Sequence, residues 1–319
     1  MSMTTANSSV LIRSELWSSQ LKDVLLDELM AQKYIRWLSE FPDGSTFTIP
    51  SIGQSQVHDY VEDTAATYDA LDTGEFQFSI TEYLQGGHYI TEKNRQDSFY
   101  AAQLEAMFVP KLQRALSVRV ETDVLALANT QTLSNPNTIN GAAHRFVATG
   151  TNETMTVTDF ALAKFALDKA NVPQNGRVAI VEPSVEFALG SQANIVNLLG
   201  PNPLWGGDMV ATGASDGMRF YRNLYGFDIY ISNYLADANE TIAGPTTATT
   251  AAGKANMFFN PSVDGGTCIG AWRQMPKVDG EYNKDFQREE YIVTARYGVK
   301  LYRPESLVVI LADTDQVTA

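Results

Sequence analysis

The chain has 319 residues, which is long enough for a sizeable core and for one or two domains. Hydrophobic residues make up 44% and charged residues 19%, values typical of a folded soluble protein. The formal net charge of -14 repels phosphate backbones and argues against sequence-specific nucleic-acid binding. It does not exclude a container that encloses nucleic acid.

The single cysteine, Cys268, excludes a disulfide within the chain and is typical of a reducing compartment. The N-terminus lacks the basic start and apolar run of a signal peptide, and no apolar stretch is long enough to span a membrane. One cysteine and three scattered histidines argue against a structural zinc site, and no glycine-rich phosphate motif occurs. We therefore expect a cytoplasmic protein without cofactor, metal or membrane partner.

The first part of the chain predicts an arm, a helix and several strands. Residues 1–20 are polar, and a helix is expected over about 15–38 because apolar residues recur at helical spacing. Short strands are expected over 46–50 and 57–62. Residues 75–81 alternate between polar and apolar side chains, which is the period of a strand.

We interpret about 52–92 as one long hairpin, with an ordinary antiparallel sheet inside the main fold as the alternative. It contains no lysine or arginine. Its carboxylates are Asp59, Glu62, Asp63, Asp69, Asp72, Glu75, Glu82 and Glu92. An acidic hairpin is either a soluble edge or a docking element for a basic surface. Because an isolated ribbon is marginally stable, a projecting hairpin would need a neighbouring subunit to cover Phe76, Phe78 and Ile80.

The middle of the chain predicts alternating helices and strands. The longest helical pattern covers 99–129, contains Pro110 and carries an apolar stripe that needs a sheet to pack on. Further helices are expected at 159–170 and 184–190, and strands at 177–181 and 227–232. Residues 200–217 and 236–255 are expected to form loops. Two antiparallel strands, 290–302 and 306–311, are expected to close an α+β fold.

This order of elements resembles the capsid fold of tailed bacteriophages, the Hong Kong ninety-seven type, which herpesvirus floors and encapsulin shells also use. Three phrases resemble phage coat sequences: Asn171–Arg177 with Val178–Pro183, Gly226–Asn233, and Ala295–Glu305. The resemblance covers about 45–312.

The resemblance implies a phage capsid fold in five parts. They are an N-terminal arm and helix (1–51), an extended hairpin (52–92), a peripheral domain with a spine helix (93–153), a mixed α/β axial domain (154–285) and peripheral closing strands (286–319). Candidate acceptors for another subunit's acidic hairpin are Lys111, Arg114, Arg119, Arg288, Arg296, Lys300 and Arg303. The loop expected near the capsomer centre contains Gly206, Gly207, Asp208, Gly213 and Gly217.

The function implied is that of a major capsid protein, not an enzyme. It would self-assemble as hexamers and pentamers into an icosahedral virion shell around double-stranded DNA, in the host cytoplasm. A portal and a separate scaffolding protein are expected, since the roughly 45 residues before the hairpin are too few for a fused scaffolding segment. The hairpin has no lysine with which to weld subunits. An encapsulin-like compartment stays open as an alternative.

A serine esterase is the less favoured alternative. Gly213–Gly217 matches the G-x-S-x-G pattern, with Ser215 as the nucleophile. Hydrolases that use this pattern place the histidine base after the serine. His58, His88 and His144 all precede Ser215, so a glycine-rich loop is the preferred interpretation.

Overall fold

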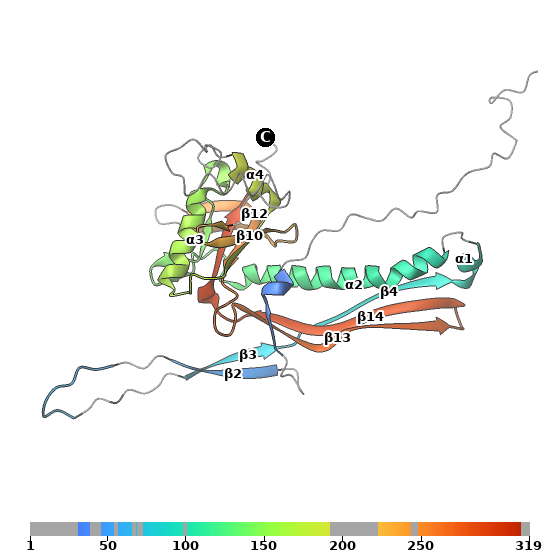
Figure 1. Cartoon of the computed structure of the whole chain (residues 1–319), viewed down its shortest axis with the longest axis horizontal. Helices are drawn as coiled ribbons and strands as arrows, with labels where there is room; N and C mark the ends of the chain where they lie inside the picture. The colour runs from blue at the N-terminus through green and yellow to red at the C-terminus, as the bar shows by residue number, and fades with distance from the viewer. Residues whose placement is uncertain are drawn as a thin grey trace, which may run out of the picture.

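A seven-stranded sheet, a four-stranded sheet and one long helix organise the chain, and a two-stranded hairpin projects from them (Figure 1). The computed structural model describes residues 31–38, 46–53, 57–65, 68, 73–97, 101–191, 223–243 and 248–313. Within these residues the fold combines helices and strands, as predicted.

The seven-stranded sheet forms the thicker part of the molecule. Its strand order is β7 (Arg145–Val147), β15 (Leu307–Ala312), β12 (Ala248–Phe259), β8 (Arg177–Val181), β10 (Phe227–Ile231) and β9 (Asn223–Leu224), with β11 (Asp237–Ala243) paired to β12. Every residue of β8 and β15 is buried, as expected for apolar strands covered on both faces. Helices α3 (Val157–Lys169) and α4 (Pro183–Ser191) cover one face. The other face packs on the end of the long helix.

The four-stranded sheet is longer and is covered on one face. Its order is β1 (Arg36–Leu38), β13 (Cys268–Asn283), β14 (Arg288–Leu301) and β4 (Glu82–Thr91). The long helix α2 (Ala101–Leu125) lies along this sheet in Figure 1. Leu112 and Leu116 of α2 pack on Val293 and Ala295 of β14. The apolar stripe predicted for the helix therefore has the sheet it requires.

Helix α2 connects the two sheets. Its end continues as the 3₁₀ helix η2 (Ala126–Thr130), and Val124, Leu125 and Leu127 enter the core below the seven-stranded sheet. Proline is expected to break or kink a helix, and Pro110 lies exposed within α2 without ending it. The short helix α1 (Glu92–Asp97) precedes α2.

Short elements complete the fold. They are η1 (Ala31–Tyr34), β5 (Thr138–Ile139), β6 (Ala142–Ala143), η3 (Thr151–Glu153) and η4 (Pro304–Ser306). Asn140 and Gly141, both with positive φ, form the turn between β5 and β6, and a two-residue turn of this kind favours that dipeptide. Helix α3 begins after Thr156, whose N–H donates to the Asp159 carboxylate at 2.7 Å.

The hairpin differs from its predicted range. Strand β2 (Thr46–Ile52) pairs antiparallel with β3 (Thr73–Ser79), and Thr46 lies opposite Ser79. Strand β4, predicted as part of the hairpin, pairs with β14 in the four-stranded sheet. The hairpin strands therefore lie within 46–79, and 82–91 belongs to the alternative that the sequence left open, an ordinary antiparallel sheet.

Four further predictions are wrong. Residues 31–38 form η1 and β1 instead of the end of a helix, whose earlier residues lie outside the described range. Residues 57–62 are not a strand. Residues 237–243 and 248–259, predicted as loop, are paired strands with Asp237 opposite Lys254. The predicted closing pair is separated, because β14 pairs with β13 and β4 whereas β15 pairs with β12 and β7.

Candidate intersubunit surface

The base of the hairpin is buried in its own chain. Phe78 is fully buried and Ile80 is nearly so, and both pack on Ile269 and Ala271 of β13. A Cβ atom at Gly298 would lie 2.8 Å from the Ser79 carbonyl oxygen, so only glycine allows this close approach. The prediction that a neighbouring subunit covers these side chains is wrong for Phe78 and Ile80.

Phe76 completes the base at its edge. Its ring lies edge-on to Tyr302 with 5.0 Å between the ring centroids. Lys300 Nζ lies 4.8 Å from the centre of the Phe76 ring and donates a hydrogen bond to the Gln77 carbonyl oxygen at 2.7 Å. Phe76 is therefore half-buried within the chain, and Lys300 stabilises the hairpin of its own subunit.

The tip of the hairpin, residues 57–65 with Tyr68, is exposed. Val57 and Tyr60 have 96% and 86% of their surface exposed, and Val61 and Tyr68 are also exposed. The carboxylates Asp59, Glu62 and Asp63 share this tip and are exposed. Asp69 and Asp72 lie outside the described residues, and Glu75 is exposed on β3. Apolar and aromatic side chains gathered at a projecting tip are typical of an interaction site.

Most of the predicted acceptors are engaged within the chain. Arg119 pairs with Asp123 at 2.9 Å and lies 3.8 Å from Glu82. Arg303 donates to the Asp264 carbonyl oxygen at 2.8 Å, and Lys300 contacts the hairpin base. Lys111 and Arg114 lie on α2.

Arg288 and Arg296 lie on the face of the four-stranded sheet that points away from α2. We call this surface the open face, and its residues are Tyr83, Tyr89, Phe286, Arg288, Ile292 and Arg296. Arg288 lies 4.5 Å from the centre of the Tyr89 ring and 4.7 Å from that of Phe286, and it pairs with Glu290 at 2.5 Å. Arg296 is opposite Tyr83. Aromatic rings beside arginine are the composition of interface hot spots.

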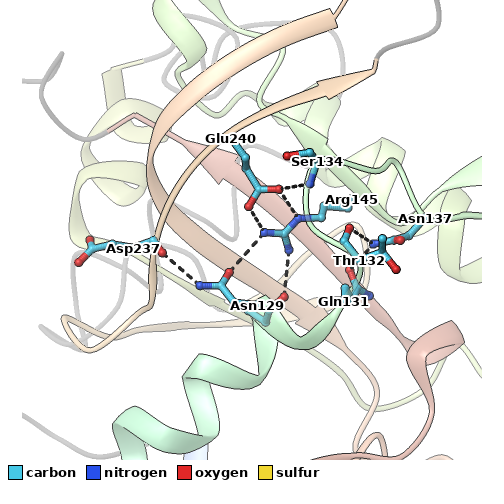
Figure 2. A network of polar contacts seen from close by, with 9 residues as sticks. Asn129, Gln131, Thr132, Ser134, Asn137, Arg145, Asp237 and Glu240 are labelled. Atoms are coloured by element: carbon cyan, nitrogen blue, oxygen red, sulfur yellow. Dashed lines mark hydrogen bonds and ion pairs between the residues drawn. The ribbon is translucent and has the colours of Figure 1, made fainter.

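A buried ion pair fixes the end of α2 to the seven-stranded sheet (Figure 2). Arg145 of β7 is fully buried and pairs with Glu240 of β11 through both Nε and Nη2. Arg145 also donates to the Ala128 carbonyl oxygen at 2.9 Å and to Asn129 Oδ1 at 3.3 Å. Because Ala128 and Asn129 belong to η2, the pair joins the spine helix to the sheet.

The charge of Glu240 is stabilised by its donors. Burial alone would raise the pKa of this carboxyl, but hydrogen bonds from Arg145 and from the Ser134 N–H lower it below the ordinary glutamate value. At the other end of the junction, the Tyr297 hydroxyl donates to Asp123 Oδ2 at 2.5 Å, and burial together with this bond raises the pKa of Tyr297. The two contacts hold η2 and α2 in place.

The candidate loop and the serine lie outside the described residues: Gly206, Gly207, Asp208, Gly213, Ser215 and Gly217. Of the histidines, His58 is at the tip, His88 stacks near Phe108 and His144 is buried. Within the described residues no cluster of histidine, cysteine and carboxylate side chains could bind a metal ion, and none of the helices could cross a membrane.

A family model described as phage capsid protein matches residues 57–310, which is most of the sequence. The chain belongs to the phage capsid protein family. The predicted identity as a shell-forming phage capsid protein is confirmed. None of the curated proteins matches the chain.

Solved capsids share the fold of this capsid protein. A structure from Mycobacterium phage Che8 is 20% identical, with a TM-score of 0.67 and coverage of 93% of this chain and 96% of that chain. The capsid of cyanophage P-SCSP1u is 18% identical, with a TM-score of 0.70 and coverage of 98% and 96%. The capsid of cyanophage Pam1 is 13% identical, with a TM-score of 0.69 and coverage of 98% of both chains.

Membership of the capsid family offers one explanation for both exposed surfaces, the hairpin tip and the open face. A shell subunit must present surfaces that other copies bind, and such surfaces remain exposed in the isolated chain. The acidic tip residues were visible in the sequence as a stretch without lysine or arginine. The Arg145–Glu240 pair was not, because its partners are 95 positions apart and neither belongs to a motif.

Proposed function

We propose that this capsid protein assembles as hexamers and pentamers into an icosahedral shell around double-stranded DNA, and that the hairpin tip holds neighbouring subunits together. The observation that carries the proposal is the contrast along the hairpin. Its base is buried in its own chain, whereas Val57, Tyr60 and Val61 at the tip are exposed. Exposed apolar side chains on a projecting ribbon cost solubility in an isolated subunit and gain free energy when another copy covers them.

The open face is the acceptor that fits the tip best. Asp59, Glu62 and Asp63 bring negative charge, and the open face offers Arg288 and Arg296 beside exposed tyrosines. Opposite charges at an interface set register and association rate more than affinity, so the apolar contacts supply most of the binding free energy. Lys300, Arg303 and Arg288 already bind groups of their own chain, so an incoming carboxylate would have to compete with those groups at each of them.

The remaining roles follow from charge and from the family. The protein catalyses no reaction in this proposal, and Ser215 belongs to a glycine-rich loop. Packaged DNA lies close to the shell without sequence-specific contact, because a subunit with a net charge of -14 repels phosphates. A portal and a separate scaffolding protein are proposed partners, and assembly takes place in the host cytoplasm.

Electron microscopy of the purified protein after concentration, with sedimentation in parallel, tests this function. The proposal expects closed shells or rings from the wild type and soluble subunits from Tyr60→Ala/Val61→Ala. The matched control is Met275→Ala/Tyr282→Ala, which removes exposed side chains from β13 and leaves assembly unchanged. Shells from the tip variant equal to wild type would contradict the role of the tip. Particles from infected cells that hold protein cargo without DNA would support an encapsulin-like compartment instead.

A further inference from the structure

The dipeptide Asn-Gly occurs twice in the sequence, at Asn140-Gly141 and at Asn175-Gly176. Asparagine is thermolabile, because the backbone nitrogen of the next residue can attack the carbonyl carbon of its side-chain amide. A following glycine favours this attack, since it has no Cβ atom to shield its nitrogen or to restrict its backbone. Both asparagines are exposed, so access to solvent alone does not distinguish the two sites.

The side-chain amide of Asn140 is held by the fold. Asn140 and Gly141 form the turn between β5 and β6, and Asn140 Nδ2 donates a hydrogen bond to the Lys169 carbonyl oxygen at 2.9 Å. Lys169 is the last residue of α3, so this bond ties the turn to the end of a helix. Movement of the amide towards the Gly141 nitrogen would break the bond, which slows the attack at this site.

The side-chain amide of Asn175 has no such restraint. In the part of the chain that the structure describes, no hydrogen bond involves the Asn175 side chain or the Gly176 N–H. Asn175 lies in the loop between α3 and β8, and its main-chain carbonyl oxygen accepts a hydrogen bond from Asn260 Nδ2 at 3.1 Å. The main chain of the loop is therefore anchored, whereas the two groups that would react are not.

The fold requires glycine at position 176. Gly176 has a φ of +76°, and a Cβ atom placed on it would lie 2.8 Å from Ser262 Oγ. A larger residue at this position would slow the attack on Asn175, but the backbone conformation and the lack of space both disfavour it. The labile dipeptide thus follows from the way in which the chain turns into β8.

We propose that Asn175 is a modification site, at which the chain converts its own asparagine to aspartate and isoaspartate faster than at Asn140. The Gly176 nitrogen forms a bond to Cγ of Asn175, the bond between Cγ and Nδ2 breaks, and ammonia leaves with the proton of the Gly176 N–H. The product is a cyclic imide, and water then cleaves one of its two C–N bonds. Cleavage at Cγ gives aspartate, and cleavage at the main-chain carbonyl carbon gives isoaspartate.

Isoaspartate changes the loop that precedes β8. It lengthens the main chain by one carbon atom between Asn175 and Gly176, and it turns the carbonyl group that Asn260 contacts into a free carboxylate. Asn260 is buried, and its Nδ2 also donates to the Pro173 carbonyl oxygen at 2.7 Å. A longer main chain no longer has the geometry that both contacts require. Modified chains are therefore less stable than unmodified ones.

Peptide mapping by mass spectrometry tests the site on the full-length subunit, kept folded in mildly alkaline buffer, where loss of the N–H proton speeds the attack. The Asn175 peptide should gain the mass difference between an amide and an acid about fivefold faster or more than the Asn140 peptide, which is the factor that one ordinary hydrogen bond gives. Two chromatographic forms of equal mass should identify aspartate and isoaspartate. In urea, which removes the Lys169 contact, the two sites should react at similar rates.

Two variants complete the test. Asn175→Gln should abolish the modification there, because a longer side chain must close a larger ring, and Asn140→Gln is the matched control. Storage until conversion is complete should lower the unfolding midpoint of Asn140→Gln by about 2 °C, as loss of one hydrogen bond does, and leave that of Asn175→Gln unchanged.

Three results would overturn the inference. Equal or faster conversion of Asn140 in the folded subunit would show that the Lys169 contact does not protect it. Conversion of Asn175 in urea but not in the folded subunit would show that the fold protects this site as well. An unchanged unfolding midpoint after complete conversion of Asn175 would show that the loop before β8 accommodates isoaspartate.

Discussion

The base and the tip of the hairpin are both rich in apolar and aromatic residues, yet their surroundings are opposite. Phe78 and Ile80 at the base are buried against β13 and β14, whereas Val57, Tyr60 and Tyr68 at the tip are exposed. Burial of the base stabilises the fold of the single subunit. Exposure of the tip leaves apolar surface in contact with water, which under our proposal a second copy buries. One ribbon thus divides into a part that serves folding and a part available for assembly.

The largest expected effect is at the base. Phe78→Ala should lower the free energy of unfolding by about 3–5 kcal/mol, because it removes a fully buried ring from a packed site. Its matched control at the tip is Tyr60→Ala, which should change stability by less than about 0.5 kcal/mol. Urea unfolding of the unassembled subunit measures both. An equal decrease in the free energy of unfolding for both variants would contradict the proposed difference between base and tip.

The next effect is at the junction between α2 and the seven-stranded sheet. Glu240→Gln should destabilise the subunit by about 3 kcal/mol, because it leaves the buried Arg145 charge without its counterion. The double variant Arg145→Met/Glu240→Leu should recover part of this loss. Thermal unfolding measures the stability of each variant. A Glu240→Gln variant as stable as wild type would contradict the stabilising role of the Arg145–Glu240 pair.

Acid should weaken the same junction. The pKa of Glu240 is lower in the folded chain than its ordinary value of 4.5, so its contribution is complete above pH 4.5 and is lost as the pH falls through the folded pKa. Burial lowers the pKa of His144 below 6.5, so protonation in the unfolded state removes further stability as the pH falls from 6.5. Urea midpoints between pH 7 and pH 3 should fall for the wild type. The decline below pH 4.5 should be smaller in Glu240→Gln.

The smallest effect is expected from charge at the tip. Reversal at Asp59, Glu62 and Asp63 to lysine should slow assembly at low ionic strength and have little effect at high salt, where charges are screened. Light scattering follows the rate. The control reverses Glu92, which is half-buried, and Asp97, which is exposed; both lie on α1, away from the hairpin. Equal slowing by both variants would show that net charge, not the tip, controls the rate.

Local patterns predicted much of the fold. The limits of β8, β10 and α3 came within a few residues because each has its own apolar run or periodicity and a clear stop, such as Asn171 before Pro173. The wrong predictions concern which strand pairs with which. Strand β4 alternates like a hairpin strand, and only its pairing with β14 places it in the other sheet. The Thr/Ala composition of 236–255 indicated a loop, although β12 is held between β15 and β8.

The candidate intersubunit surface was also predictable only where it depends on local sequence. Acidic residues at 59, 62 and 63 are a local feature, and they lie at the exposed tip. Which cations could receive them depends on sheet register and on contacts from distant residues. Lys300 and Arg288 look alike in sequence, but one contacts the hairpin base and the other stacks between Tyr89 and Phe286. Counting charged residues in the sequence could not distinguish the roles of Lys300 and Arg288.

The most direct test replaces residues 57–68 by a short Gly/Ser turn and measures folding and assembly on the same sample. Our account predicts the wild-type unfolding midpoint, a Cys268 thiol as slow to react as in wild type because η1 and the core still bury it, and no shells in electron micrographs. A variant that fails to fold would show that the tip belongs to the core. A variant that builds normal shells would show that the tip does not hold subunits together.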